Sequence, residues 1–241
     1  MYAGKKIGVV VPAYNEEEFI ESVIRNIPNF IDAIFIVNDA STDSTAKIIK
    51  SLKQDRIYCI NHNNNRGVGA SIVSGYKIAI ENNMDIVVVM AGDDQMDAAY
   101  LTRLLDPVIE QKADYAKGNR LYNLTYRRGM SNWRFFGNWI LTILTKIASG
   151  YWKVRDPQNG YTAINRKALE SINLDTLYPY YGYCNDLLVK LHIAGCKVID
   201  IPIPSRYGTE KSKIEYSSYI RRVSLLLMRN FLLRLNMEYL K

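Results

Sequence analysis

Acidic side chains and an amide crowd one short stretch, directly after an apolar run at residues 85–90. The stretch contains Asp93, Asp94, Gln95 and Asp97. Hard divalent cations prefer oxygen ligands, and Mg²⁺ commonly binds one or two carboxylates together with substrate phosphates. The stretch therefore predicts a site where a metal ion bridges a diphosphate. The alternative is that these aspartates cap helices and shape turns, as most loop aspartates do.

Asp39 is a second candidate, because it follows another apolar run at residues 33–37. Its carboxylate could accept hydrogen bonds from the ribose or base of a nucleotide. Residues 67–70 read Gly-Val-Gly-Ala, a weak match to a dinucleotide-binding loop, because they follow the third apolar run and lack a third glycine. We expect a tight turn there that admits a close ligand or helix. His62 and His192 lack metal-ligand spacing, and no Ser-His-Asp arrangement is legible.

The elements that must position these groups alternate between strand and helix patterns. Continuous apolar runs predict strands covered on both faces, and they lie at 7–12, 33–37, 56–60 and 85–90. Helical patterns lie between them at 16–26, 44–53 and 68–82. This order predicts an α/β fold with an open, mostly parallel sheet and helices on both faces. Ligands of such sheets bind beyond the carboxyl ends of the strands, where the candidate residues lie.

Two longer apolar helical patterns follow in the second half of the chain. Residues 133–147 have tryptophans in or beside them, and residues 219–237 carry four arginines. Both patterns fit helices that lie in a membrane interface, with cations near lipid phosphates. They equally fit helices whose apolar faces pack on the core. No uncharged apolar run approaches the roughly 20 residues needed to cross a bilayer, so we expect no spanning segment.

The net charge of +7 is unevenly distributed along the chain. Residues 117–155 contain eight basic and no acidic side chains, and residues 206–241 contain eight basic and three acidic ones. The rest of the chain carries a net negative charge, so the excess of basic side chains is confined to these two segments. This distribution predicts an anionic partner that binds at one place and not over the whole surface. A nucleic-acid-binding module could use the basic segments for phosphate contacts, but it would leave the acidic stretch unexplained.

Composition and cysteine usage indicate a globular protein with reduced thiols. Of 241 residues, 48% are apolar and 23% charged, which is typical of globular proteins and argues against disorder. We expect a single domain over residues 1–241. The three cysteines form no CxxC pair and no signal peptide precedes Ile7, so we expect a reduced, cytoplasmic protein. A dinucleotide-dependent oxidoreductase is disfavoured, because no glycine loop follows the first strand.

Seven motifs, in order along nearly the whole chain, resemble those of family 2 glycosyltransferases with the GT-A fold. They are VPAYNE (11–16), NDASTDST (38–45), NRGVGA (65–70), AGDDQMD (91–97), DPQNGY (156–161), NDLL (185–188) and RYGTEKSK (206–213). The subgroup that they resemble contains dolichyl-phosphate mannose and polyprenyl-phosphate glucose synthases. The resemblance implies an inverting transfer of a sugar from a nucleoside diphosphate. It favours UDP over GDP, because the match to the mannose enzymes is weaker around 161–163.

The resemblance also implies a division of the chain into three parts. Residues 1–115 would form the nucleotide-sugar-binding half, 116–215 the acceptor and catalytic half, and 216–241 an amphipathic C-terminal helix. The nucleotide sugar would be bound by residues from both halves, namely Pro12, Tyr14, Glu16, Asp39, Gly67, Gly69, Asp93, Lys211 and Ser212.

Metal and catalytic roles follow from the same motifs. Asp93 and Gln95 would bind Mg²⁺ or Mn²⁺, although Ala91 replaces the first aspartate of the family's metal motif. Asp186 matches the catalytic carboxylate, and Arg206 could neutralise the departing diphosphate or a lipid phosphate. The tyrosine-rich residues 178–183 could form a wall that stacks on the sugar, or pack beneath a loop.

The acceptor remains open between two classes. A phosphate is already an anionic nucleophile, so positioning and charge neutralisation would dominate catalysis. A saccharide or protein hydroxyl needs a base, and Asp186 would then be indispensable. We expect a polyprenyl or dolichyl phosphate as acceptor and a peripheral location on the cytoplasmic face of a membrane, because the two cationic amphipathic patterns fit a lipid partner.

Overall fold

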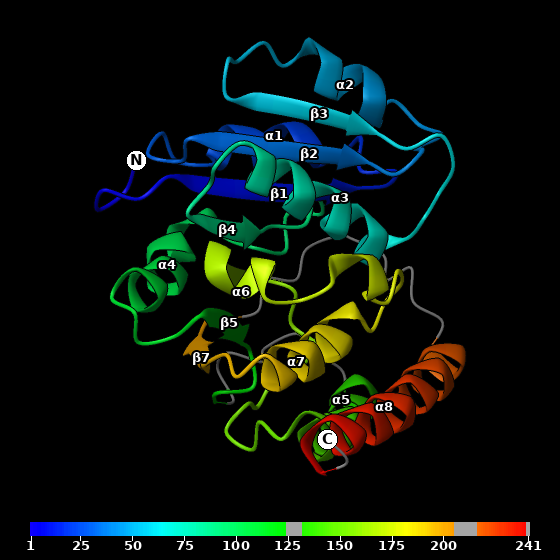
Figure 1. The fold of residues 1–241 in the computed structure, drawn as a ribbon. Coiled ribbons are helices and arrows are strands. Elements are labelled where there is room, and N and C mark those ends of the chain that lie inside the picture. The colour runs from blue at the N-terminus through cyan, green and yellow to red at the C-terminus, as the bar shows by residue number, and fades with distance from the viewer. Residues whose placement is uncertain (124–131, 205–215, 240–241) are drawn as a thin grey trace.

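A central sheet runs through the molecule (Figure 1). Within residues 1–123, 132–204 and 216–239, which the computed structural model describes, seven strands form this sheet. The strands are β1 (Ile7–Ala13), β2 (Ala33–Asn38), β3 (Ile57–Asn61), β4 (Ile86–Val89), β5 (Tyr115–Asn119), β6 (Thr162–Asn165) and β7 (Val198–Pro202). The helices are α1 (Ile20–Asn26), α2 (Thr45–Ser51), α3 (Val68–Glu81), η1 (Ala98–Tyr100), α4 (Leu101–Ile109), α5 (Asn132–Ser149), α6 (Arg166–Glu170), η2 (Leu174–Thr176), α7 (Tyr183–Ile193) and α8 (Tyr216–Tyr239).

The strand order is β3-β2-β1-β4-β6-β5-β7. Strand β6 is antiparallel to both of its neighbours, and the other pairs are parallel. The predicted α/β fold is therefore confirmed, and each of the first four strands ends within one residue of its predicted bounds.

One predicted helix is too long, since α1 begins at Ile20 and not at residue 16. The backbone N–H groups of Glu16 and Glu17 donate instead to side chains that follow β2, Thr45 Oγ1 (2.8 Å) and Asp43 Oδ2 (3.2 Å). The Glu16 carbonyl still accepts the N–H groups of Phe19 (3.1 Å) and Ile20 (2.9 Å), so residues 16–19 form a turn that leads into α1 and is tied to the loop after β2.

Helices on both faces explain the continuous apolar strands. On β1, Val9 and Val11 belong to the core formed with α1, α2 and α4, whereas Val10 belongs to the core formed with α3, α6 and α7. Successive side chains of a strand point to opposite faces, so a strand covered twice must be apolar at every position.

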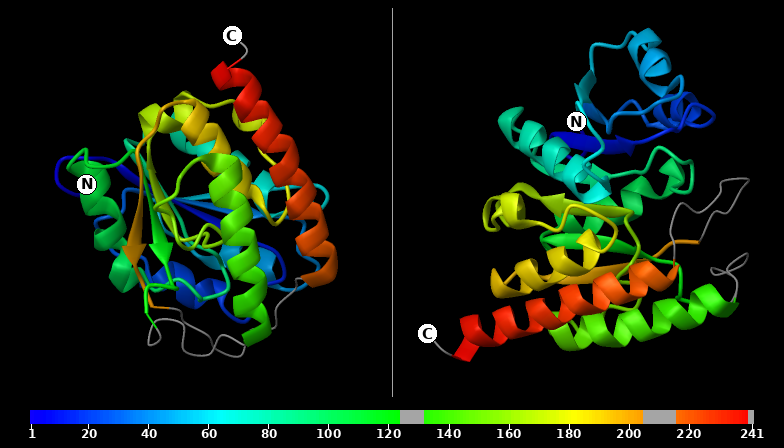
Figure 2. Two further views of the ribbon diagram at one scale, coloured as in Figure 1. Left: turned by 90° about the horizontal axis from the view of Figure 1, so that it is seen from below. Right: turned by 90° about the vertical axis from the view of Figure 1, so that its right-hand side faces the viewer.

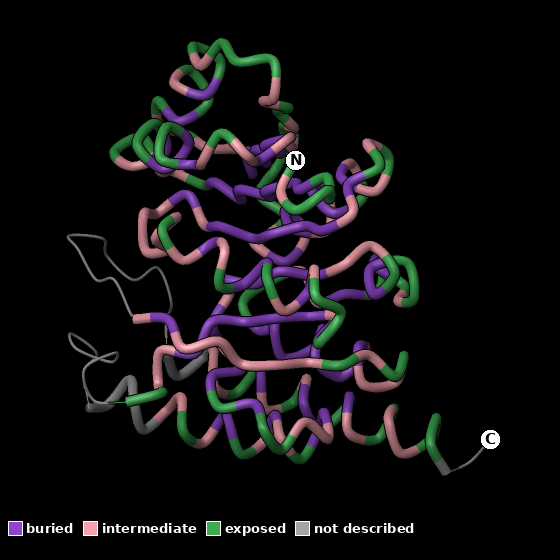
Figure 3. Tube along the Cα trace, turned by 90° about the vertical axis from the view of Figure 1, so that its left-hand side faces the viewer, coloured by how far each residue is buried: buried purple, intermediate pink, exposed green. Residues whose placement is uncertain are grey.

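Strands β1, β2, β4 and β5 are buried throughout (Figure 3). The prediction that the run at 56–60 is covered on both faces is wrong, because β3 lies at an edge of the sheet, and Tyr58 and Cys59 are exposed. Strand β7, at the other edge, is only partly buried.

Helices α5 and α8 run side by side and pack on α7 (Figure 2). Their shared core contains Leu141 and Ala148 of α5, Val189 of α7, and Val223 and Leu227 of α8. One apolar side of each long helix therefore packs within the protein, which is the alternative in which the apolar faces of these helices pack on the core. Among the described residues, no helix is long and apolar enough to cross a membrane.

Candidate active site

The order of strands changes direction between β1 and β4, because β2 and β3 lie beyond β1 while the later strands lie beyond β4. Ligands of open α/β sheets bind at such a switch point, outside the carboxyl ends of the strands. The loop after β4 packs directly on the end of β1, where the Gly92 N–H donates to the Pro12 carbonyl (3.2 Å). The topology therefore brings residues 14–16 and 91–95 to the same edge.

Three of the six non-glycine residues with a positive φ in the described parts of the chain follow strands at this edge. Asn15, Ala40 and Asp94 follow β1, β2 and β4, and all three adopt positive φ angles of 53°, 59° and 59°. The left-handed conformation costs about 1 kcal/mol or more for a residue such as alanine, and it persists only where the surroundings hold it. Here the Thr42 N–H donates to Asn15 Oδ1 (2.8 Å), and the Asn15 N–H donates to Ser41 Oγ (3.1 Å).

The buried carboxylate of Asp39 organises the loop before α3. Its Oδ1 lies 2.6 Å from His62 Nδ1 and accepts the Arg66 N–H (2.9 Å), while Oδ2 accepts the Gly67 N–H (2.8 Å). His62 Nε2 in turn lies 2.9 Å from Ser74 Oγ. The sequence analysis missed this Ser-His-Asp row, although His62 directly follows β3, so the strand-end rule could have placed it beside Asp39. The row fixes a loop backbone at the edge of the site.

Gly67 and Gly69 permit a close approach, and what approaches is a loop of the same chain. A Cβ on Gly67, at φ +92°, would lie 2.5 Å from the carbonyl oxygen of Pro179. A Cβ on Gly69 would lie 2.2 Å from the carbonyl oxygen of Tyr178. The Ala70 N–H also donates to the Pro179 carbonyl (3.0 Å). The start of α3 and the loop of residues 178–182 thus touch without any space for side chains.

Asp93 and Glu16 act on one hydroxyl. Partial burial of Tyr181, which stays 44% exposed, raises its pKa, and the negative charges of Asp93 and Glu16 raise it further. Residues from the loops after β1 and β4 therefore lie near the same tyrosine, as the sequence predicts. Tyr180 and Tyr181 are exposed and Tyr183 is buried, so only part of the tyrosine run packs in the core.

Asp93 and Gln95 share one turn, in which the Gln95 N–H donates to Asp93 Oδ1 (3.2 Å). Within the described parts of the chain, no group of three or more His, Cys, Asp or Glu side chains could hold a metal ion. One carboxylate with one amide oxygen, completed by phosphate oxygens, is a typical environment of Mg²⁺. The donor set at Asp93 and Gln95 fits Mg²⁺ or Mn²⁺ held in this way.

Asp186 lies buried in the first turn of α7 and bonds to three parts of the structure. Lys190 Nζ donates to both carboxylate oxygens (3.0 Å each), Asn230 Nδ2 of α8 donates to Oδ1 (2.7 Å), and the Tyr178 N–H donates to Oδ2 (2.8 Å). Both oxygens therefore accept hydrogen bonds from groups of the protein itself.

A buried ion cluster, which the sequence analysis did not identify, lies where β5 ends and β6 begins. Arg120 donates to Asp156 through Nε (2.8 Å), a terminal nitrogen (3.0 Å) and its backbone N–H (3.0 Å). Lys117, fully buried in β5, donates to the backbone carbonyls of Asp156 and Asn159. Burial alone would raise the pKa of Asp156, but Arg120 and Lys117 outweigh it and lower that pKa. Lys117 could have indicated this cluster in the sequence, because a lysine inside a buried strand needs hydrogen-bond acceptors close to it.

Three predicted site residues, Arg206, Lys211 and Ser212, lie outside the described residues. Of the others, Pro12 contacts the loop after β4, and Glu16 and Asp93 both lie near Tyr181 at the switch point. Gln95 is bonded to Asp93, and Tyr14 belongs to the same loop as Glu16. Asp39 meets Gly67 through a hydrogen bond. Asp186 lies behind the loop of residues 178–182, bonded to α7 and α8.

An apolar surface lies opposite the packed sides of α5 and α8. It consists of side chains at helical spacing that we call the outer face: Trp139, Ile143 and Ile147 of α5, and Leu225, Met228 and Leu232 of α8. Trp139 is 52% exposed and Leu232 59% exposed. Arg221, Arg222 and Arg229 are also exposed on α8.

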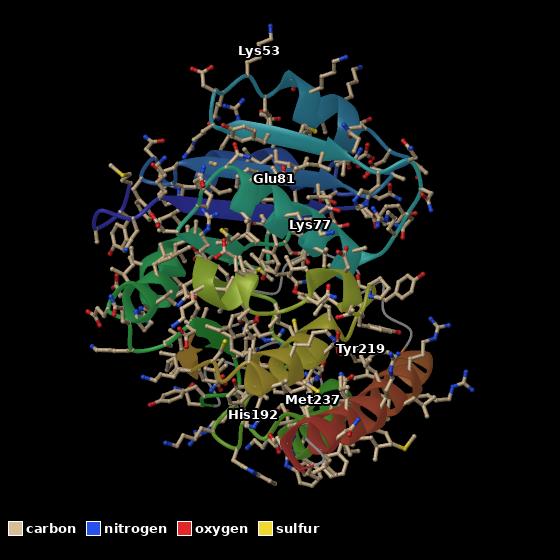
Figure 4. All side chains as sticks on the ribbon, viewed as in Figure 1. Lys53, Lys77, Glu81, His192, Tyr219 and Met237 are labelled. Carbon is tan, nitrogen blue, oxygen red and sulfur yellow. The ribbon has the colours of Figure 1, made fainter. Side chains whose placement is uncertain are left out.

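The C-terminal part of α8 is joined to both neighbouring helices. Arg234 donates to the carbonyls of Ala148 (2.9 Å) and Ile147 (3.1 Å) at the end of α5. His192 Nε2 of α7 lies 3.0 Å from Glu238 Oε1 of α8. Figure 4 shows His192 near Met237 at this end of the two helices.

Comparison with known proteins gives the same fold and a family. The profile of the family described as Glycosyl transferase family 2 matches residues 8–172. A UDP-N-acetylglucosamine–dolichyl-phosphate N-acetylglucosaminyltransferase of Methanococcus voltae is 30% identical over an aligned length of 220 residues, and the alignment covers 85% of this chain and 87% of that protein. An undecaprenyl-phosphate mannosyltransferase of Micrococcus luteus is 25% identical over 209 residues, 82% of either chain.

A solved structure supports the fold. Glucosyl-3-phosphoglycerate synthase of Mycobacterium tuberculosis, in complex with Mn²⁺, UDP and phosphoglyceric acid, aligns with a TM-score of 0.73 at 22% identity. The alignment covers 95% of this chain and 79% of that one. The predicted resemblance to the GT-A fold is confirmed.

Proposed function

Because the chain belongs to glycosyl transferase family 2, we propose that it transfers a sugar, with inversion, from UDP to the phosphate of a polyprenyl or dolichyl lipid. The observation that carries the acceptor is the outer face of α5 and α8, which exposes large apolar side chains beside exposed arginines. Interfacial helices bury such a face in lipid while their cations meet anionic head groups. The relatives that are named for dolichyl phosphate and undecaprenyl phosphate support the same acceptor.

The donor is proposed to lie at the switch point between β1 and β4. Tyr14, Glu16 and the loop fixed by Asp39 would hold the nucleotide, and Asp93 with Gln95 would hold Mg²⁺ or Mn²⁺ against the diphosphate. When bound, the metal supplies positive charge that stabilises the departing diphosphate. The UDP named for the N-acetylglucosaminyltransferase relative and bound in the mycobacterial structure supports UDP as the nucleotide.

Transfer to a phosphate needs no proton to be removed from the nucleophile. An acceptor phosphate oxygen forms the new bond to the anomeric carbon as the bond to UDP breaks, and UDP leaves with the electron pair. The protein then has to position the two reactants and neutralise their charges. We propose that Arg206 and Lys211 contribute to this neutralisation and that Ser212 donates a hydrogen bond to a phosphate.

The buried position of Asp186 supports a phosphate acceptor over a hydroxyl. A general base must reach the proton that it takes, and both oxygens of Asp186 already accept hydrogen bonds from Lys190, Asn230 and the Tyr178 N–H. Asp186 stays the candidate base for the alternative, transfer to a saccharide or protein hydroxyl.

A transfer assay with paired acceptors tests the proposal. The protein is incubated with Mn²⁺, labelled UDP-N-acetylglucosamine, UDP-glucose or GDP-mannose, and vesicles that contain dolichyl phosphate or undecaprenyl phosphate. Vesicles with dolichol, which has a hydroxyl in place of the phosphate, are the matched control. We expect label in the organic extract only with a lipid phosphate and a UDP-sugar. Equal transfer to dolichol, or transfer only to water-soluble acceptors, would contradict the proposed acceptor.

Substitution of Asp186 by Asn separates the two acceptor classes further. If Asp186 were the base for a hydroxyl, the rate would fall about 10²- to 10⁴-fold while the KM of the donor stayed unchanged. For a phosphate acceptor we expect the change to appear in donor binding, because Asp186 holds the loop against the start of α3.

A further inference from the structure

We propose that Asn230 of α8 is a positioning residue for the donor pocket, acting through Asp186 and the loop of residues 178–182. The inference rests on the proposed function, because it takes the start of α3 as one wall of that pocket. Three consecutive contacts carry it, and the first and third join groups that are distant in the sequence.

The first contact joins α8 to α7. Asn230 is buried among the apolar side chains that attach α8 to the protein, and its Nδ2 donates to Asp186 Oδ1 (2.7 Å). A buried amide costs free energy unless it is hydrogen-bonded, and an apolar residue of similar size would serve packing alone. The amide therefore acts through its bond to Asp186.

The second contact joins Asp186 to the loop. While Oδ1 accepts from Asn230, Oδ2 accepts the Tyr178 N–H (2.8 Å), and Lys190 neutralises the carboxylate from within α7. A second link lies at the other end of the loop, where a Cβ on Gly182 would lie 2.9 Å from Val223 of α8. The loop is thus held at both ends by contacts that depend on where α8 lies.

The third contact joins the loop to the start of α3. The Ala70 N–H donates to the Pro179 carbonyl (3.0 Å), and the carbonyl oxygens of Tyr178 and Pro179 face Gly69 and Gly67 with no space for a Cβ. Because these contacts are between backbone atoms, a displaced loop displaces the turn at Gly67. Asp39 holds the same turn from the other side, through its bond to the Gly67 N–H (2.8 Å).

The chain of contacts therefore runs from α8, whose outer face is proposed to meet the lipid, to the loop that Asp39 organises at the donor edge. The Asn230–Asp186 bond is thus the hydrogen bond through which α8 helps to hold the pocket wall. We expect loss of the Asn230 amide to weaken nucleotide binding without removing any group that touches the nucleotide.

The test measures binding of UDP and of GDP, each with Mn²⁺, to the full chain by isothermal titration calorimetry, alongside thermal unfolding. For Asn230→Leu we expect about three- to tenfold weaker binding of the nucleotide that the unsubstituted chain binds. The matched control is Arg234→Ala, which removes the bonds of α8 to Ile147 and Ala148 of α5 without touching Asp186. We expect it to lower the unfolding temperature and leave nucleotide affinity unchanged.

A charge swap tests the Asn230–Asp186 bond itself and decides the question even if Asn230→Leu fails to fold. Asn230→Asp places two carboxylates together and should weaken nucleotide binding, whereas the double variant Asp186→Asn/Asn230→Asp restores one amide–carboxylate pair and should recover affinity. Wild-type affinity in Asn230→Leu, no recovery in the double variant, or affinity that follows unfolding temperature in every variant would overturn the inference. If the unsubstituted chain binds neither UDP nor GDP, the proposed function itself fails and the inference with it.

Discussion

The carboxyl edge of the sheet and the outer face of α5 and α8 differ in which kind of side chain is buried and which is exposed. At the edge, charged groups are buried and hydrogen-bonded, with Asp39 bound to His62 and two backbone N–H groups and Asp156 bound to Arg120. On the outer face, large apolar side chains lie in solvent, and Leu225 and Leu232 are each more than half exposed.

The difference indicates which region has its side chains satisfied by contacts within the chain and which region does not. Buried charges at the edge are compensated by internal hydrogen bonds, so that region holds its geometry before any ligand arrives. Full burial of a leucine or methionine side chain is worth about 1.5–3 kcal/mol, and the part of it that these half-exposed side chains forgo is regained only when another surface covers them. We infer that the edge is preorganised for a small charged ligand and that the outer face needs an external partner.

Removal of the Asp93 carboxylate should have the largest effect on turnover. For Asp93→Ala we expect sugar transfer to fall about 10³-fold, or about 4 kcal/mol, because the proposed metal loses its carboxylate ligand. Initial rates at saturating Mn²⁺ measure this. The control is Asp97→Ala, since the Asp97 carboxylate accepts the Ala99 N–H (2.9 Å) as a cap of η1. Equal losses in both variants would remove the metal assignment.

The buried pair at the same edge should dominate stability. Asp156→Asn removes the buried negative charge that pairs with the guanidinium of Arg120, and we expect the free energy of unfolding in urea at pH 7 to fall by about 3 kcal/mol. The comparison variant is Asp175→Asn, which breaks an exposed pair with Lys77 and should cost less than about 0.5 kcal/mol. Similar costs would mean that the buried cluster is not preorganised.

The same carboxylate predicts a pH dependence. Because the folded-state pKa of Asp156 is lowered, its contribution to stability is full above the ordinary aspartate pKa of about 4. The contribution is lost as the pH falls through the lower folded-state pKa. Urea unfolding between pH 6 and pH 3 should therefore show a smaller loss of stability for Asp156→Asn than for the unsubstituted chain. Parallel curves would contradict the sign.

Polar substitution of the outer face should affect membrane binding alone. For Leu225→Ser/Met228→Ser/Leu232→Ser we expect at least about tenfold weaker co-sedimentation with vesicles, since partial burial of three such side chains is worth more than about 1.4 kcal/mol. Unfolding temperature should stay unchanged. Leu227→Ala, on the packed side of α8, should behave in reverse, with a loss of about 2–5 kcal/mol of stability and unchanged vesicle binding.

The smallest effect is expected from single cations beside the outer face. Arg229→Gln should weaken binding to anionic vesicles by about 1 kcal/mol at low salt, and the difference should shrink as salt screens the charge. Lys53→Gln is the control, because Lys53 is exposed at the far end of the molecule from α8 (Figure 4). Equal weakening by both would indicate attraction to the net charge and not to this face.

The sequence predicts the sheet well because local signals determine it. Strands covered on both faces must be apolar throughout, and the groups that follow them must meet at one edge, so the proximity of Glu16 and Asp93 could be expected. The start of α1 at Ile20 could not be predicted, because the turn before it is held by bonds to Thr45 and Asp43, which follow a different strand.

The Asn230–Asp186 bond could not be predicted for a related reason. The two residues are 44 positions apart on different helices, and their contact depends on how α8 is rotated against α7. The apolar pattern of α8 allows either a packed or an exposed face, and the structure contains both. Asn230 stands out as a buried polar residue only after the structure has shown which face of α8 is packed.

The position of β6 has a consequence for biosynthesis. Strand β6 pairs with β4 on one side and β5 on the other, yet it is translated after both. A nascent chain can assemble β3-β2-β1-β4 as soon as β4 has left the ribosome, whereas β5 has no sheet partner until β6 follows more than forty residues later. During that interval the open edge of β4 is a template for wrong pairing, so we expect slowed translation between β5 and β6 to increase aggregation.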